Sequence, residues 1–366
     1  MRTTCLFTFR PRGTHGFPVN LLFSFIMVLG TSFTPGLHAQ DPLPPQHLEI
    51  TGSHQLRLTY DCSFTWPQQA GTRAVIYLPI PPDTGGQRID QFTSTLKGQI
   101  QTDDANPPHR LMTTTIRHDR GDASRVYWRI EIIGRFQTRQ LVDGPPAAAS
   151  PPITSPGPCE FLDSSESINW KSDAFQDWLN SSGLRRSANE TPARYGARIF
   201  AYFRSHGRYS YPPETLWNAG AVCRHLRTDC GGFSLVFTAA CRANKIPARL
   251  LVGQWFKTRE LAGGTLDLTG RQAHVIAEFF DPAIGWIPED ISSTLMGISN
   301  NGDTNYFGRD PGYFFTWHVD TDFRLDTPQK PNAHVQWIQN PSPWFSANAS
   351  DVYDSLSHHW TLETLN

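Results

Sequence analysis

Residues 227–242 read RTDCGGFSLVFTAACR. After Cys230, apolar residues occur at positions 233, 236, 237, 240 and 241, the spacing of a helix with one buried face. The pattern predicts a helix whose first turn contains Cys230. Gly231 and Gly232 carry no side chains, so they leave the backbone beside the cysteine uncrowded.

The predicted position of Cys230 suits a nucleophile. The first N–H groups of a helix lack partners within the helix, and the helix start carries a partial positive charge. Both features favour the thiolate, the reactive form of cysteine, and the same N–H groups can stabilise an oxyanion on an attacked carbonyl. Taken alone, Cys230 is also compatible with a buried structural cysteine or a disulfide partner.

A histidine and a carboxylate follow at positions that paired strands would bring together. Residues 272–290 predict a strand, a turn and a second strand, with His274 near the beginning and Asp290 at the end. A carboxylate on one imidazole nitrogen fixes the ring, so that the other nitrogen can accept the thiol proton. Glu289 is the alternative carboxylate, but strand alternation places it on the face opposite to Asp290.

These segments resemble the bacterial transglutaminase-like domain over about residues 165–325. The resemblance rests on several blocks in a fixed order: CGGF at 230–233, IPAR at 246–249, His274 at a strand start, GWIPED at 285–290 and YFG at 306–308. It implies a papain-like α+β fold in which the nucleophile helix packs on an antiparallel sheet. It also implies that Cys230 is the nucleophile, His274 the general base and acid, and Asp290 the orienting carboxylate.

Several neighbouring residues need their own interpretation. Many relatives have glycine where Lys245 stands, and Asn244 could supply the left-handed helix stop instead. The Gly-rich insert at residues 257–272 is either a lid or groove edge, or a plain loop. Arg249 is expected to make a structural ion pair or hydrogen bond. Trp217 could wall the acyl site, donate its indole N–H to the oxyanion, or pack in the core.

Other cysteines and histidines allow a zinc site to be considered. Cys223, His225, Cys230 and His274 could supply ligands, but their spacing matches no paired-knuckle pattern. We therefore expect no metal and no cofactor. A disulfide from Cys223 or Cys241 would leave Cys230 free, and both can equally be reduced thiols.

The chain divides into five predicted segments. Residues 1–39 read as a signal peptide and residues 40–142 as a small all-β sandwich. Residues 143–160 are a Pro-rich linker, residues 161–325 the transglutaminase-like catalytic domain, and residues 326–366 a C-terminal extension. The fold class is thus α+β, with the catalytic domain preceded by the β sandwich.

The segments outside the catalytic domain contain few chemical candidates. His109 and His118 lie among charged loop residues and are expected on the surface. Cys62 and Cys159 could be bridged, although sequence alone gives no connectivity. Three tryptophans give the extension enough apolar area to pack on the catalytic domain: Trp337, Trp344 and Trp360.

The N-terminus predicts export, to the cell envelope or periplasm or out of the cell. Three arginines precede an apolar run at residues 21–33, and the run is shorter than the ~20 residues that span a bilayer. Stable membrane insertion is therefore not expected after signal removal. Loss of Cys5 would leave five of the six cysteines, an odd number. The formal net charge of −1, without a basic stripe, excludes a nucleic-acid partner.

Together these patterns predict an acyltransferase or a cysteine peptidase or amidase. The thiolate would attack an amide or peptide carbonyl of a protein or peptide substrate, form a thioester, and pass the acyl group to an amine or to water. The alternative is an exported scaffold that binds peptide or cell-wall polymer without turnover.

Overall fold

The computed structural model describes residues 44–66, 71–102, 109–119, 124–145, 161–256, 265–268, 273–299, 305–346 and 355–365. The predicted signal peptide, residues 146–160 of the predicted linker, and Cys159 with its suggested bridge to Cys62 lie outside the described residues. An all-β region precedes a mixed region of helices and strands, which confirms the predicted α+β class.

Two sheets form a β sandwich around the long strands β1 (Gln46–Thr65) and β6 (Arg125–Asp143), which pair along their whole length. From Leu56 to Phe64, alternate β1 residues are buried between the sheets, because successive side chains of a strand point to opposite faces. The first sheet has the order β10-β18-β1-β6-β13, with β3 also on β6, and the second has the order β17-β2-β5-β4. The other strands of the two sheets are β2 (Thr72–Pro79), β3 (Gln87–Ser94), β4 (Gln99–Thr102), β5 (Arg110–His118), β10 (Thr265–Leu268), β13 (Arg309–Asp310), β17 (Ser342–Phe345) and β18 (Ser357–Leu365).

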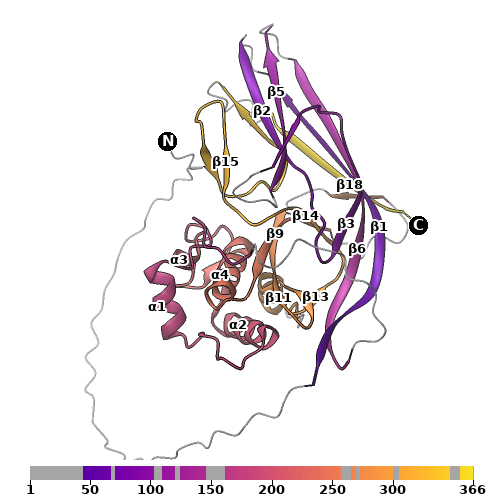
Figure 1. Ribbon diagram of the computed structural model, residues 1–366. Coiled ribbons are helices and arrows are strands. Elements are labelled where there is room, and N and C mark those ends of the chain that lie inside the picture. Colours follow the sequence, from indigo (N-terminus) through magenta and orange to yellow (C-terminus); the bar gives the residue numbers. More distant parts are fainter. Residues whose placement is uncertain are drawn as a thin grey trace, which may run out of the picture. The chain divides into compact units, whose positions relative to one another are not determined.

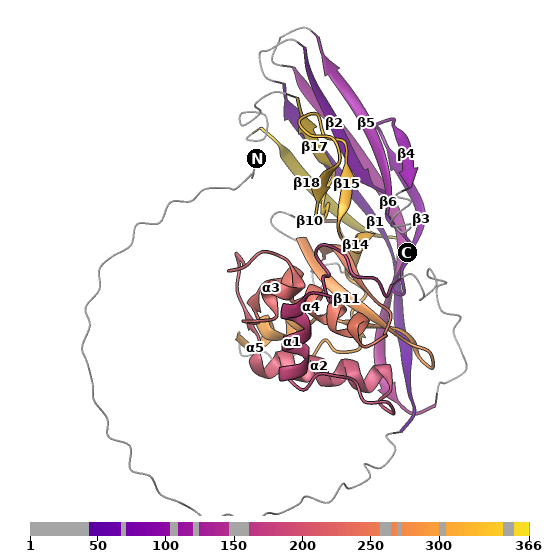
Figure 2. The same ribbon diagram turned by 60° about the vertical axis from the view of Figure 1, so that its left-hand side comes forward.

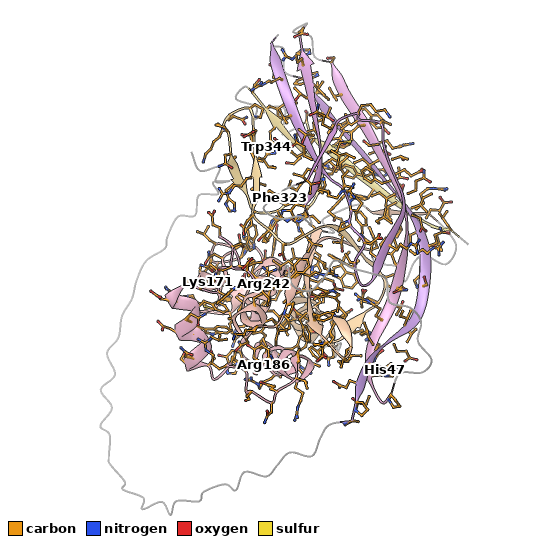
Figure 3. The ribbon with its side chains drawn as sticks, viewed as in Figure 1. His47, Lys171, Arg186, Arg242, Phe323 and Trp344 are labelled. Carbon is orange, nitrogen blue, oxygen red and sulfur yellow. The ribbon has the colours of Figure 1, made fainter. Side chains whose placement is uncertain are left out.

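The C-terminal segment completes this sandwich, a role that the sequence analysis did not foresee. Strand β18 pairs with β1, and β17 pairs with β2. Without β18, one edge of the long strand β1 would be open to association with other chains. The hairpin β15 (Phe323–Leu325) and β16 (Ala333–Val335) packs on the β17-β2 side through a cluster that includes Phe323, with Trp344 at its edge (Figure 3).

The expectation that His109 and His118 lie on the surface is wrong. His109 is fully buried, its Nε2 lies 2.7 Å from the carbonyl oxygen of Val319, and its ring stacks on Phe323. His118 is buried against Trp66, with the two rings nearly parallel. The covering residues near position 320 are far away in sequence, so the local polarity around His109 could not reveal its burial.

The catalytic region is a four-stranded antiparallel sheet of order β12-β11-β9-β14 with helices packed against it. Figure 1 shows α4 lying against β9 and β11, with α1, α2 and α3 beyond it. None of the helices in the described residues is long and apolar enough to cross a membrane. The elements are α1 (Asp173–Ser181), α2 (Pro192–His206), β7 (Arg208–Tyr209), α3 (Ala219–Val222), β8 (Arg227–Thr228), α4 (Cys230–Ala243), β9 (Ala248–Trp255), β11 (Ala273–Asp281), β12 (Gly285–Glu289), α5 (Ile291–Ser299) and β14 (Phe314–Val319).

Helix α4 begins at Cys230, as its pattern predicts, but it is buried on all sides from Gly231 to Arg242 rather than along one stripe. Its end differs from the expectation. Lys245, not Asn244, takes the left-handed conformation, with φ of 59°. Asn244 instead donates its side-chain N–H to the carbonyl oxygen of Ala240 at 2.9 Å. A lysine thus occupies backbone that glycine adopts more easily.

The sandwich and the catalytic region belong to one compact unit that begins at residue 44. Strands β1 and β6 extend past the sandwich and run beside the catalytic region (Figures 1 and 2). Here Arg139 of β6 contacts Glu278 of β11 and Asp310 of β13, each at 2.8 Å. Arg249 of β9 contacts the same Glu278 at 2.7 Å. All four side chains are buried and their charges balance, which a buried ionic cluster requires.

Candidate active site

Cys230 is the first residue of α4 and is partly exposed. The helix is capped by Asp229, whose carboxylate accepts the Gly232 N–H at 3.1 Å. A side chain at position 231 would collide with Trp337, since an added Cβ would lie 2.6 Å from its ring. The glycine therefore allows an aromatic wall to approach the thiol closely. This arrangement leaves the sulfur at a helix N-terminus that faces open space.

Trp217 lies beside the thiol, but its indole N–H is already engaged. It donates to Asp229 at 2.8 Å, so the cap of α4 is held from both sides. Burial raises the pKa of Asp229 above its usual range, although the hydrogen bonds from Trp217 and Gly232 oppose the shift. Of the three interpretations considered for Trp217, the structure favours the wall: its ring lines the groove and the N–H points at the cap.

His274 is the second residue of β11, and its Nε2 lies 2.7 Å from Oδ2 of Asp290. Its second nitrogen, Nδ1, is left for the Cys230 sulfur, with which the ring forms a hydrogen bond. Burial opposes protonation of the imidazole, but the charges of Asp290 and Cys230 outweigh it and raise the pKa of His274 to about 10. The ring is therefore protonated at neutral pH.

Asp290 lies between the end of β12 and the start of helix α5. Its Oδ1 accepts hydrogen bonds from the Ser292 hydroxyl at 2.6 Å and the Ser293 N–H at 2.9 Å, and its Oδ2 accepts the Ser293 hydroxyl at 2.6 Å. Burial would raise the pKa of Asp290, yet the positive His274 and the serine hydrogen bonds lower it. These bonds fix the carboxylate that holds the imidazole.

Glu289 does not share the histidine with Asp290 but has a hydrogen-bond partner of its own. Its side chain is buried and accepts the Ile291 N–H at 3.1 Å. Burial, followed by the nearby charge of Asp290, raises the pKa of Glu289 well above its usual range. Of the two carboxylates weighed from the sequence, Asp290 is the one that contacts the histidine.

The zinc grouping considered from the sequence is not formed. Cys223 is buried against the carbonyl oxygen of Gly220, away from Cys230. In the described part of the chain, no three histidine, cysteine or acidic side chains form a group that could hold a metal ion. Cys62, Cys223, Cys230 and Cys241 carry free thiols.

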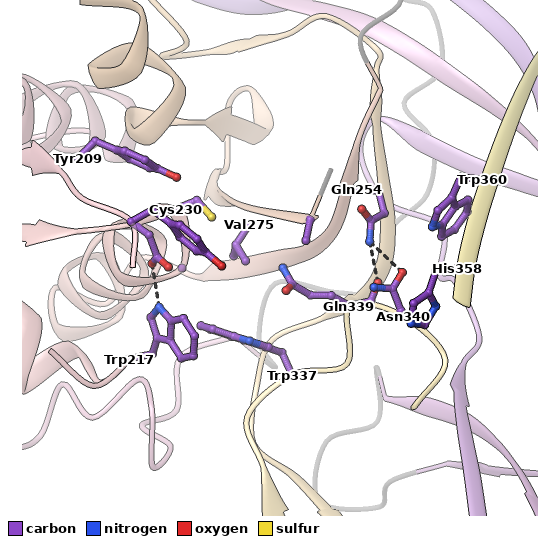
Figure 4. A pocket seen from close by; sticks show the side chains of 14 residues that line it. Tyr209, Trp217, Cys230, Gln254, Val275, Trp337, Gln339, Asn340, His358 and Trp360 are labelled. Atoms are coloured by element: carbon purple, nitrogen blue, oxygen red, sulfur yellow. Dashed lines mark hydrogen bonds between the residues drawn. The ribbon is translucent and has the colours of Figure 1, made fainter. Parts of the chain in front are cut away.

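A groove of about 450 Å³ lies in front of Cys230. Figure 4 shows Trp217 and Trp337 on one side of it and Gln254, Gln339 and Asn340 farther along. His358 and Trp360 of β18 also line it. No sequence pattern assigns the C-terminal residues to the site. The signal available was the set of tryptophans in that segment, which predicted packing on the catalytic domain but not a place in the groove.

Three comparisons relate the chain to known proteins. A family model described as Transglutaminase-like superfamily matches residues 183–291, which contain Cys230, His274 and Asp290. No curated protein matches the chain significantly. A crystal structure of a candidate cysteine protease from Cytophaga hutchinsonii is similar, with a TM-score of 0.51 and 12% identity over 87% of this chain and 93% of that chain.

A second solved structure, the periplasmic domain of TgpA from Pseudomonas aeruginosa bound to ethylmercury, gives a TM-score of 0.34 and 13% identity over 66% of this chain and 92% of that chain. The Cytophaga structure shows the shared fold. The family model supports membership of a cysteine-dependent enzyme family in general. Residues 183–291 of the chain form a transglutaminase-like domain.

Proposed function

We propose that the protein is an acyl-transfer enzyme in which Cys230 is the nucleophile, His274 the acid and base, and Asp290 the carboxylate that orients the imidazole. The observation that carries the proposal is the contact chain from the sulfur through the ring to the carboxylate, with 2.7 Å between the histidine and the aspartate. This is the relation that a nucleophile, its base and the orienting group of the base require.

In the first half of the reaction, the Cys230 sulfur attacks the carbonyl carbon of a carboxamide or peptide bond and forms a C–S bond. The oxyanion would form beside the N-terminus of α4, where the partial positive charge of the helix favours it. When the C–N bond breaks, the protonated His274 gives its proton to the departing amine. The products are a thioester on Cys230 and free amine or ammonia.

In the second half, an amine or a water molecule attacks the thioester carbonyl. Neutral His274 takes the proton from the attacking group, and the C–S bond breaks to restore the thiolate and the imidazolium. Transfer to an amine gives a cross-link, and transfer to water gives hydrolysis. Asp290 holds the ring in one orientation through both halves.

The substrate class and location are part of the same proposal. We assign a protein or peptide substrate, because the attacked group is an amide carbonyl. The basic and apolar segment at residues 1–39 supports export to the envelope or to the outside of the cell.

The proposal is tested by mass spectrometry of glutamine-containing peptides incubated with the full-length protein and a primary amine. We expect a mass change for amine incorporation, deamidation or peptide cleavage, and its loss in Cys230→Ala. Cys223→Ala, which alters a thiol away from the groove, is the matched control and should keep the activity. Equal activity in wild type and Cys230→Ala would reject the proposal.

A further inference from the structure

Apart from the Cys230–His274 pair and the buried Asp229, the groove in front of Cys230 offers no fixed charge to a substrate. Among the described residues that line it there is no lysine, arginine or glutamate. The carboxylate of Asp229 is buried and engaged by Trp217 and Gly232. His358 also lines the groove. Burial lowers the pKa of its ring, so the ring is neutral at pH 7. A charged substrate group entering the groove would lose water without gaining a counter-charge.

One wall of the groove is aromatic. The rings of Trp217 and Trp337 lie 4.9 Å apart at 60°, and the Trp337 ring closes over Gly231. Gln336 holds this wall in place, because its side-chain N–H groups reach the carbonyl oxygen of Trp217 and, at 2.8 Å, the Ser167 hydroxyl. Such a rigid indole surface accommodates aliphatic or aromatic side chains.

The opposite part of the groove carries amide groups. The Gln254 side chain donates to the carbonyl oxygen of Gln339 at 2.9 Å and to the Asn340 side-chain oxygen at 3.2 Å, which fixes the backbone of this segment. The carboxamide of Gln339 has no hydrogen-bond partner among the described residues. Figure 4 shows it extending from the C-terminal segment toward Val275 and Cys230. A carboxamide has both donors and an acceptor, as a peptide unit does.

We propose that residues 337–340 form the wall that selects the acyl donor, and that Gln339 is a specificity-determining residue. The groove takes an extended, uncharged peptide segment whose side chain packs on Trp337. Gln339 hydrogen-bonds the peptide unit next to the carbonyl that Cys230 attacks. This inference rests on the proposed function and names its substrate class.

The test measures kcat/KM by mass spectrometry for three peptides that differ at the residue beside the reacting amide, which is alanine, aspartate or lysine. The wild type should process the alanine peptide at least about tenfold better than either charged peptide. Gln339→Ala should lower kcat/KM for the alanine peptide about three- to tenfold, the effect of one neutral hydrogen bond. Gln339→Glu should restore part of the activity toward the lysine peptide only.

Two controls separate this inference from the proposed function. The rate of Cys230 alkylation by iodoacetamide should be the same in Gln339→Ala and wild type, because the thiol and its base are untouched. Gln99→Ala, which alters an exposed glutamine on β4, should leave all three values of kcat/KM unchanged.

Equal turnover of the three peptides, with no effect of Gln339→Ala, would overturn the inference but leave the proposed function standing. Absence of any Cys230-dependent turnover would reject both. Protection of Cys230 from iodoacetamide by soluble glycan but not by the alanine peptide would assign the groove to a carbohydrate and overturn the inference.

Discussion

Two histidine–aspartate pairs in this protein have nearly the same geometry. His274 and Asp290 meet through Nε2 at 2.7 Å, and so do His334 and Asp322. Both carboxylates also accept hydrogen bonds from two serine hydroxyl groups and from a backbone N–H. The carboxylate side of the pair therefore does not distinguish a candidate catalytic histidine from a structural one.

The difference lies at the other ring nitrogen. Nδ1 of His274 is left for the Cys230 sulfur in a buried site, whereas Nδ1 of His334 lies 3.4 Å from the exposed Glu166. The His274 ring lies between the Cys230 thiol and the Asp290 carboxylate, and the His334 ring joins two carboxylates. We infer that the partner of Nδ1, together with burial, decides which pair can do chemistry.

Replacing each histidine by alanine should give the largest difference in activity between the two pairs. We expect His274→Ala to lower kcat/KM about ten-thousandfold, because the group that moves the proton is lost. His334→Ala should act through stability alone and leave kcat/KM within about twofold. Peptide turnover measured by mass spectrometry, with thermal unfolding of each variant, checks both. A similar loss of activity in two folded variants would contradict the distinction.

The two aspartates give the next largest contrast. Asp290→Asn should lower kcat/KM about a hundred- to a thousandfold, because the amide no longer stabilises the imidazolium or fixes its tautomer. Asp322→Asn should cost about 2–3 kcal/mol of unfolding free energy, since a buried acceptor of several hydrogen bonds is altered. Chemical denaturation and steady-state kinetics separate the two effects. If Asp322→Asn lowers turnover at a temperature where the variant is fully folded, the prediction that Asp322 acts through stability alone is wrong.

The raised pKa of His274 predicts how activity changes with pH. Its proton is needed for the leaving amine, so kcat/KM should fall as pH rises through about 10. Protonated His274 also stabilises the fold. This contribution is fully present below the unfolded pKa of about 6.5 and is lost as pH rises through about 10. In Asp290→Asn the alkaline fall should move to lower pH, and in His334→Ala it should not move. Profiles of kcat/KM and of the denaturation midpoint against pH measure the effect on activity and the effect on stability.

The parts of the candidate site that the sequence predicted are those with local signals. The spacing after Cys230 indicates the helix, and the strand–turn–strand pattern after His274 leads to Asp290. The choice between Asp290 and Glu289 follows from the alternation of strand residues. These features depend on neighbours only a few positions away, so a single sequence can contain them.

The parts that the sequence did not predict depend on partners far along the chain. Strand β18 pairs with β1 some 300 residues away, and no pattern in either segment names the other. The placement of Gln339 in the groove depends on the contact of its carbonyl oxygen with Gln254, 85 residues earlier. The second histidine–aspartate pair is a further case: Asp322 belongs to the predicted catalytic domain and His334 to the predicted extension, and no sequence pattern links the two.

The smallest expected effect concerns the group that faces His334. Glu166 is 56% exposed and also pairs with Arg324, whose side chain is 50% exposed, at 2.8 Å. Solvent screens such pairs, so Glu166→Gln should change the unfolding free energy by less than about 1 kcal/mol, and less still at high salt. Turnover should not change.

In the His274–Asp290 pair, the group that faces Nδ1 is Cys230. We expect Cys230→Ala to abolish turnover while leaving the fold intact. Thermal unfolding at two salt concentrations, with peptide turnover, measures both variants. A large loss of activity in Glu166→Gln would show that the second pair communicates with the groove through Gln336, which contacts both Ser167 and Trp217. We do not expect this outcome, because solvent screens the charge of the exposed Glu166 carboxylate.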